Sequence, residues 1–213
     1  MNLAERMRPK DFSQVIGQDK AVATIQRFQK SGLGGRAILL TGKTGTGKTT
    51  LARLTAAEFS PDFAVIEIDA TGLTANDIER LLERTSGRPL TGGGWTIIVN
   101  EIQGMSRGTM TKLLTALECG REGLLWIFTT TADKMEDLQA KFPDDWPMFY
   151  GRCNHLPLSQ RMGVDIVASY VRTIAQAEGL DGKPLKAYER LVNECRGSIR
   201  ECLTRIESGA MLD

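Results

Sequence analysis

The stretch Leu40-Thr41-Gly42-Lys43-Thr44-Gly45-Thr46-Gly47-Lys48-Thr49-Thr50 decides the fold of this chain. It has the complete spacing G-x-x-x-x-G-K-[ST] of a phosphate-binding loop. The apolar run Ala37-Ile38-Leu39-Leu40 precedes it and a helical pattern from Leu51 to Phe59 follows, which is the context that the motif requires. A plain Gly/Thr-rich turn is the alternative interpretation, and the presence of both flanking elements argues against it.

Each residue type in this loop has a chemical role toward a nucleotide. Glycines let backbone amides surround phosphates, Lys48 reaches the terminal phosphates, and Thr49 offers its hydroxyl to Mg²⁺. The helix after Lys48 also directs its positive N-terminal end at the anion. The residues expected to hold the nucleotide are Gly42, Thr44, Gly45, Thr46, Gly47, Lys48, Thr49 and Thr50.

The second half of such a site is a buried strand that ends in carboxylates, and Thr96-Ile97-Ile98-Val99-Asn100-Glu101 supplies it with one change. Glu101 stands where a glutamate polarises the attacking water. Asn100 stands where an aspartate completes the Mg²⁺ environment, so its neutral amide is expected to weaken metal binding and to slow hydrolysis. Thr49 and Asn100 are thus the expected metal residues. An ordinary core strand ending in Asn-Glu is the alternative.

Composition limits the classes of protein to which the chain can belong. A length of 213 residues is enough for one large domain and a small one, and the net charge of +1 provides no global attraction to nucleic acid. The four cysteines are scattered and the N-terminus has no apolar signal core, so a cytoplasmic protein with reduced thiols is expected. No run approaches the roughly 18 apolar residues of a membrane span.

Further motifs resemble one family. Leu3-Ala4-Glu5-Arg6-Met7-Arg8-Pro9-Lys10-Asp11-Phe12, followed by Val15-Ile16-Gly17-Gln18, resembles the R-P-x-x-[FL]-x-x-[VI]-[IV]-G-Q opening of AAA+ ATPases of the clamp-loader clade. Ile66-Glu67-Ile68-Asp69-Ala70, and later Met105-Ser106-Arg107, resemble segments of bacterial clamp-loader motor subunits. The resemblance implies ATP as the nucleotide, and it adds Arg8, Pro9, Val15 and Ile16 to the residues expected to bind it.

The resemblance also implies sensor residues. Ile127-Phe128-Thr129-Thr130-Thr131-Ala132 resembles the strand of the first sensor, for which Thr130 is the candidate and Thr131 the alternative. Gly151-Arg152-Cys153 is similar to the Ser-Arg-Cys motif, whose arginine reaches the ATP site of the next subunit, although glycine replaces the serine here. Gly197-Ser198-Ile199-Arg200-Glu201-Cys202-Leu203 resembles the family's G-S-x-R-D-A-L, so Arg200 is the expected second sensor. A solvated surface charge is the alternative for either arginine alone.

Three departures from the family are visible. The four-cysteine zinc module of bacterial motor subunits is missing, because residues 57–63 run directly into the next strand, so no zinc site is expected. The stretch from Asp133 to Tyr150 is longer than the family's connection, and we expect a surface insertion. The chain stops at Asp213, where clamp-loader subunits continue into a collar, so no collar domain is expected.

The pattern of elements predicts an α/β fold with an AAA+ P-loop NTPase core. The short continuous apolar runs Ile38–Leu40, Val65–Ile68, Ile97–Val99 and Leu124–Phe128 are typical of parallel strands covered on both faces. After Pro157 only helical patterns remain. The predicted domains are therefore an ATPase domain at 1–157 and a small all-helical lid domain at 158–213.

The expected function is that of an ATPase subunit that assembles with copies of itself or with relatives through the ATPase domains, grips DNA, and remodels a partner such as a sliding clamp. Replication-fork maintenance ATPases, branch-migration motors and helicase loaders are alternatives, as is a structural subunit that hydrolyses ATP poorly because of Asn100. In the resembled family the segments with Arg80, Arg84, Arg88 and Arg107 face a DNA channel. An ordinary mixed-charge helix explains these arginines equally well.

Overall fold

The computed structural model describes residues 1–89, 91–159 and 162–212. The chain divides into two compact units. We call the first the sheet unit, which comprises Lys20–Gly42 and Lys48–Leu158. The second is the helical unit, which comprises Met1–Asp19, Lys43–Gly47 and Ser159–Asp213.

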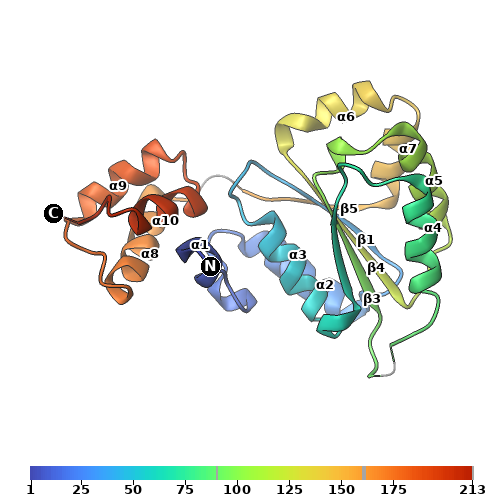
Figure 1. Cartoon of the computed structure of the whole chain (residues 1–213), viewed down its shortest axis with the longest axis horizontal. Helices are drawn as coiled ribbons and strands as arrows, with labels where there is room; N and C mark the ends of the chain where they lie inside the picture. The colour runs from blue at the N-terminus through green and yellow to red at the C-terminus, as the bar shows by residue number, and fades with distance from the viewer. Residues whose placement is uncertain (90, 160–161, 213) are drawn as a thin grey trace. The chain divides into compact units, whose positions relative to one another are not determined.

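The sheet unit is built on a five-stranded parallel sheet in the order β2-β3-β4-β1-β5, and this confirms the predicted α/β fold (Figure 1). The strands are β1 (Ala37–Thr41), β2 (Val65–Asp69), β3 (Trp95–Asn100), β4 (Leu124–Thr130) and β5 (Asn154–Pro157). The first four contain the four apolar runs of the sequence. β5 was not predicted, because only Leu156 of its residues is buried.

Helices cover both faces of this sheet, with α2 and α3 on one side and α4, α5 and α7 on the other (Figure 1). Alternate residues of the central strands point to opposite faces, so Trp126 and Phe128 join the core beneath α5 and α7 while Leu125 and Ile127 face the other way. The helices of the sheet unit are α2 (Asp19–Ser31), α3 (Lys48–Ala57), α4 (Ala75–Arg84), α5 (Arg107–Glu118), α6 (Met135–Lys141) and α7 (Asp145–Arg152), with short 3-10 turns η2 (Asp62–Ala64), η3 (Ile102–Gly104) and η4 (Ala132–Lys134).

The expected surface insertion at 133–150 is wrong. This stretch forms α6 and α7, and three of its aromatic residues, Phe142, Trp146 and Phe149, are at most 5% exposed within the main core. Phe149 contacts Phe128 edge-on at a ring-centroid distance of 4.9 Å. The segment is therefore part of the layer that covers the sheet.

The helical unit has a core of its own, formed by α8 (Val164–Ala177), α9 (Leu185–Glu194) and α10 (Ile199–Glu207). The N-terminal helix α1 (Leu3–Arg6) adds Leu3, which is fully buried and donates its backbone N–H to Glu207 at 2.9 Å. The turn η1 (Phe12–Gln14) belongs to the same unit. The predicted helical domain at 158–213 does not include the N-terminal residues that lie in this unit, since no pattern in the sequence joins Leu3 to α10. Among the helices described, none is long and apolar enough to cross a membrane.

Candidate functional site

The C-terminal ends of three neighbouring strands bring the predicted catalytic residues of the sheet unit to one edge of the sheet. Thr41 at the end of β1 pairs in register with Thr130 at the end of β4. Val99 of β3 pairs with Phe128, so Asn100 lies beside Thr129. Because the strands are parallel, the phosphate-binding loop, Asn100-Glu101 and Thr130, the predicted first sensor, all lie at or just after the strand ends at this same edge.

Lys48 opens helix α3 at this edge. Its side chain is 6% exposed, and Nζ donates to the backbone oxygen of Gly42 at 2.9 Å, across the loop that the two residues bracket. The amide groups of the first turn of α3 point out of the helix end, and they add partial positive charge to the ammonium. Buried cationic groups at a helix N-terminus are suited to hold phosphate.

The tip of the loop, residues 43–47, belongs to the helical unit, where its backbone takes a shape that glycine permits. Gly45 and Gly47 have φ values of 82° and 93°. A Cβ at Gly45 would lie 2.4 Å from Ser198 Oγ, so a side chain there would collide with the Gly197-Ser198 turn. Gln18 is buried and donates Nε2 to the backbone oxygen of Thr46 at 3.3 Å.

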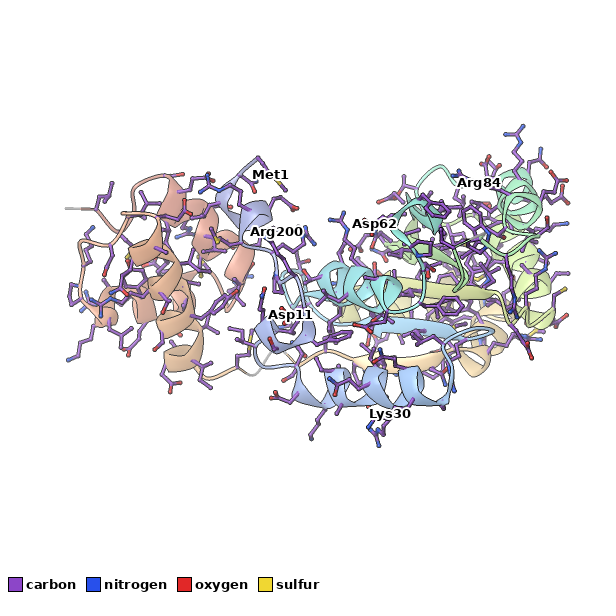
Figure 2. The ribbon with its side chains drawn as sticks, turned by 90° about the horizontal axis from the view of Figure 1, so that it is seen from below. Met1, Asp11, Lys30, Asp62, Arg84 and Arg200 are labelled. Carbon is purple, nitrogen blue, oxygen red and sulfur yellow. The ribbon has the colours of Figure 1, made fainter. Side chains whose placement is uncertain are left out.

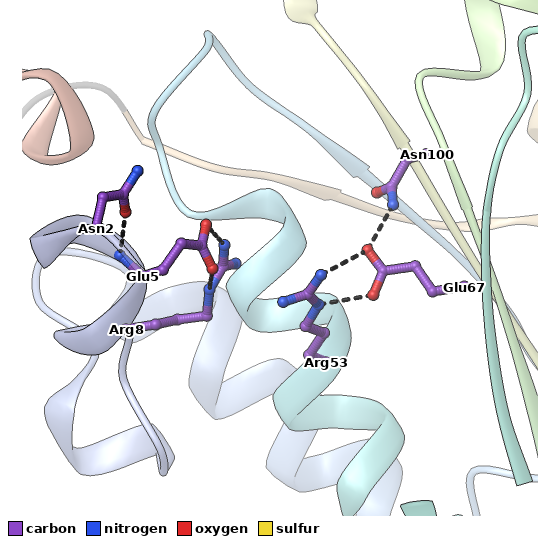
Figure 3. A network of polar contacts seen from close by, with 6 residues as sticks. All are labelled: Asn2, Glu5, Arg8, Arg53, Glu67 and Asn100. Atoms are coloured by element: carbon purple, nitrogen blue, oxygen red, sulfur yellow. Dashed lines mark hydrogen bonds and ion pairs between the residues drawn. The ribbon is translucent and has the colours of Figure 1, made fainter. Parts of the chain in front are cut away.

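Asn100 is held by polar partners on both sides of its amide (Figure 3). Its Nδ2 donates to Glu67 of β2 at 2.8 Å, and its Oδ1 accepts from the hydroxyl of Thr129 at 3.1 Å. Arg53 of α3 donates to both carboxylate oxygens of Glu67, at 2.6 and 3.2 Å. The carboxylate bound to Asn100 is thus already neutralised by a guanidinium, and the amide orientation is fixed because a carboxylate only accepts.

Glu101 adopts a left-handed backbone conformation, with φ 55° and ψ 54°. For a residue other than glycine this conformation costs on the order of 1 kcal/mol, and such strain is concentrated at functional sites. Its backbone N–H donates to Thr129 at 3.2 Å, and its carboxylate accepts from Gln103 Nε2 at 2.5 Å. Thr130, which is fully buried, donates to Gln103 Oε1 at 2.8 Å. Gln103 was missed by sequence reasoning, since no motif assigns a role to that position.

The sequence matches the family described as ATPase family associated with various cellular activities (AAA) over residues 38–145, which is more than half of the chain. The chain belongs to this AAA family. The match spans the phosphate-binding loop, Asn100-Glu101 and Thr130, so these parts of the site lie within it.

This AAA chain is similar to curated replication proteins. It is 27% identical over 230 residues to DNA polymerase III subunit gamma of Buchnera aphidicola, covering 96% of this chain and 60% of that protein. It is 24% identical to the replication factor C large subunit of Methanococcus aeolicus, covering 99% of this chain and 44% of that protein. The AAA chain therefore spans less than two thirds of the length of these relatives. The resemblance to the clamp-loader clade is confirmed.

The fold of the AAA chain is also that of a solved Thermotoga maritima RuvB Holliday junction branch migration motor, with a TM-score of 0.72. The two sequences are 19% identical, and the likeness covers 96% of this chain and 72% of the other. At this level of identity the likeness establishes the fold.

Arg152 ends α7 in the AAA chain, remote in sequence from the loop, and it has partners within its own unit. Its guanidinium forms an ion pair with Glu118 at the end of α5 and donates to the backbone oxygen of Met148 at 2.9 Å. Burial raises the pKa of the neighbouring Cys153 thiol far above its usual range, so this thiol remains protonated. Both ring nitrogens of His155, in β5, form hydrogen bonds. Nε2 lies 2.7 Å from Thr41 Oγ1, and Nδ1 lies 2.6 Å from Tyr150 Oη.

The remaining predicted nucleotide residues lie in the helical unit. Arg8 forms an ion pair with Glu5 at 2.5 Å, and Asn2 Oδ1 accepts from the backbone N–H of Glu5 at 3.0 Å (Figure 3). Pro9, Val15 and Ile16 follow and are partly buried. Arg200 is the second residue of α10 and is exposed (Figure 2).

The arginines considered for DNA contact are all exposed, and each has a partner in the sheet unit. Arg80 pairs with Asp77, and Arg88 pairs with Glu122. Arg84, at the end of α4 and labelled in Figure 2, lies over the ring of Trp95. Arg107 donates to the backbone oxygen of Lys141 at 3.0 Å. These contacts are those of an ordinary mixed-charge surface, and DNA contact stays a prediction.

Proposed function

We propose that this chain is the ATP-hydrolysing part of an oligomeric DNA-replication assembly of the clamp-loader type, which couples ATP to DNA binding and to remodelling of a sliding clamp. The observation that carries the proposal is the placement of Lys48, Glu101 and Thr130 at one edge of the sheet. The similarity to DNA polymerase III subunit gamma and to the replication factor C large subunit supports the replication context.

The residues present fit ATP, because Lys48 is buried at a helix N-terminus and the loop glycines have the positive φ values that bring backbone amides close to phosphate. Mg²⁺ would be held by the Thr49 hydroxyl and the Asn100 amide oxygen, and would neutralise charge on the phosphates. Glu101 takes a proton from the attacking water, whose oxygen then bonds to the terminal phosphorus as ADP leaves. Arg200 is proposed as the second sensor.

The test is ATP turnover by the purified chain with and without primed DNA, over a range of protein concentrations. Turnover that rises with protein concentration and with primed DNA supports the clamp-loader proposal. Stimulation by four-way junctions in place of primed DNA would favour a branch-migration motor, for which the RuvB fold provides the precedent. If ATP turnover depends neither on protein concentration nor on DNA, the oligomeric mechanism is contradicted.

A hydrolysis-weak subunit is the second candidate, and the Asn100–Glu67 contact favours it. Asn100→Asp is expected to raise turnover and to lower the Mg²⁺ concentration needed, because a carboxylate attracts the ion more strongly than an amide. The change also replaces a donor to Glu67 by a second carboxylate. Without Mg²⁺ and ATP, the free energy of unfolding should therefore fall by about 1 kcal/mol.

Two measurements check the effects of Asn100→Asp. ATP turnover as a function of Mg²⁺ concentration measures the change in metal dependence, and thermal unfolding without Mg²⁺ and ATP measures the change in stability. The double variant with Glu67→Gln should recover part of the lost stability, since the new amide can donate to the aspartate. Asn193→Asp, on an exposed position of α9, is the matched control and should change neither quantity. Unchanged metal dependence and rate in Asn100→Asp would show that the amide is merely tolerated.

Arg152 is proposed to act on the nucleotide of a neighbouring subunit. Arg152→Ala should leave ATP binding by the dilute protein intact, yet reduce turnover on the order of 10³-fold where assembly occurs. A Glu101→Gln subunit still offers its arginine to an Arg152→Ala partner, so mixing the two inactive proteins should restore part of the activity. Arg121→Ala, a nearby arginine that donates to Leu82, is the control. If mixing restores nothing while wild-type turnover depends on concentration, the arginine does not act across the interface.

A further inference from the structure

The side chain of Gln103 joins two residues that come from different strands. Gln103 lies in η3, two residues after Glu101, and its Nε2 donates to Glu101 Oε2 at 2.5 Å. Its Oε1 accepts from the hydroxyl of Thr130, at the end of β4, at 2.8 Å. One amide therefore connects the proposed general base to the proposed first sensor.

The chemistry of the three groups fixes the direction of both hydrogen bonds. An ionised carboxylate only accepts, so the NH₂ group of Gln103 must face Glu101. The amide oxygen must then face Thr130, and it also only accepts. The single hydroxyl proton of Thr130 is consequently donated to Gln103, which leaves the lone pairs of the Thr130 oxygen as its remaining hydrogen-bonding capacity.

The direction of this bond and the burial of Thr130 limit the contacts that its hydroxyl can make. Phosphate oxygens are acceptors, so a hydroxyl whose proton is already donated has nothing to offer them. Thr130 is also fully buried, so its hydroxyl oxygen has no surface on which a water could bind, and the contact that it makes is the one that holds Gln103. Since Gln103 occupies Glu101 Oε2, the other oxygen of that carboxylate is left for a proton of the attacking water.

We propose that Gln103 is a positioning residue: the buried Thr130 hydroxyl holds its amide oxygen, and its NH₂ group holds one oxygen of Glu101, so that the other oxygen of Glu101 is directed at the attacking water. This rests on the proposed ATPase function. The water O–H bond directed at Glu101 breaks and its proton moves to the carboxylate. The water oxygen bonds to the terminal phosphorus, and the bond from that phosphorus to the ADP oxygen breaks.

The turn itself does not need the Gln103 amide. Its backbone is closed by Gly104 N–H to Glu101 O at 2.9 Å and by Met105 N–H to Ile102 O at 3.1 Å. Ile102 and Met105 are fully buried on either side, and Lys141 Nζ donates to the backbone oxygen of Gln103 at 2.9 Å. Removal of the amide should therefore change the orientation of Glu101 and Thr130 while the turn remains folded.

The test compares Gln103→Met, which keeps the length of the side chain without its polar atoms, with Thr130→Val and the double variant. Each should lower kcat by about 100-fold, because Glu101 is no longer held in position toward the attacking water, while the affinities for ATP and for ADP stay unchanged. The double variant should be no slower than the slower single variant, because both remove the same chain of bonds. Thr130→Ser should keep wild-type turnover.

Gln29→Met is the matched control, since Gln29 also donates its amide to a glutamate, Glu58, on the surface of the same unit. A Thr130→Val protein that binds ATP more weakly than wild type, with ADP affinity unchanged, would overturn the inference, because the hydroxyl would then contact the terminal phosphate. An unchanged kcat in folded Gln103→Met would also overturn it. Wild-type turnover that Glu101→Gln leaves intact would instead remove the proposed function, and the inference with it.

Discussion

Lys48→Ala is expected to reduce the affinity for ATP by about 10- to 100-fold, since a hydrogen bond to a charged group contributes about 1.5 to 3 kcal/mol. Lys48 is the buried ammonium at the start of α3, and it already lies across the loop from the oxygen of Gly42. In the bound state the terminal phosphates would replace that carbonyl as acceptors. Calorimetric titration with ATP measures the loss directly.

Lys43→Ala is the matched control for this experiment. Lys43 occupies a variable position of the same motif, and its side chain is exposed. Its backbone oxygen accepts from the Thr46 hydroxyl, and this bond does not depend on the side chain at position 43. We expect this variant to bind ATP as the wild type does. Near wild-type affinity in Lys48→Ala would contradict the assignment of the loop.

Glu101→Gln should keep ATP binding and lose turnover by roughly 10²- to 10⁴-fold, the range associated with general-base catalysis. The amide retains an oxygen that can accept from Gln103, so the local geometry is preserved. It has no basic site for the proton of the attacking water. Single-turnover phosphate release and calorimetry on the same preparation separate the chemical step from binding.

Glu79→Gln, which removes the carboxylate of a surface ion pair with Lys112, serves as the control and should retain turnover. If Glu101→Gln hydrolyses ATP at the wild-type rate, Glu101 is not the base. The proposal that this chain hydrolyses ATP through Glu101 would then lose its main support, because the Glu101→Gln and Glu79→Gln variants would behave alike.

β1, β3 and β4 could be predicted because each contains an unbroken apolar run, as expected for strands that are covered on both faces. β2 could be predicted although Glu67 interrupts its apolar run. β5 escaped prediction since Asn154, His155 and Pro157 gave no such run, and an edge strand tolerates them. In the segment 133–150, Phe142, Trp146 and Phe149 do have helical spacing. Pro143 and Pro147 concealed it, although a proline in the first turn of a helix removes no intrahelical bond.

Residues of the site could be predicted where a motif specifies their spacing, as for Lys48, Asn100 and Glu101. The partners of Asn100 could not, because Glu67 and Arg53 reach it from β2 and α3 and only the register of the sheet brings them together. Gln103 was invisible for the same reason, as its contact with Thr130 joins residues from separate strands. Long-range polar contacts depend on side-chain geometry that no local pattern encodes.

His155 provides an internal spectroscopic probe, because it is the only histidine of the chain. Burial lowers the pKa of its imidazole, so near neutral pH the ring has one N–H, with one nitrogen donating and the other accepting. Nε2 contacts Thr41, the residue before Gly42, and Nδ1 contacts Tyr150, two residues before Arg152. The two nitrogen-15 resonances of this single ring thus report together on the phosphate-binding loop and on α7, the helix that ends at Arg152, without any label attached to the protein surface.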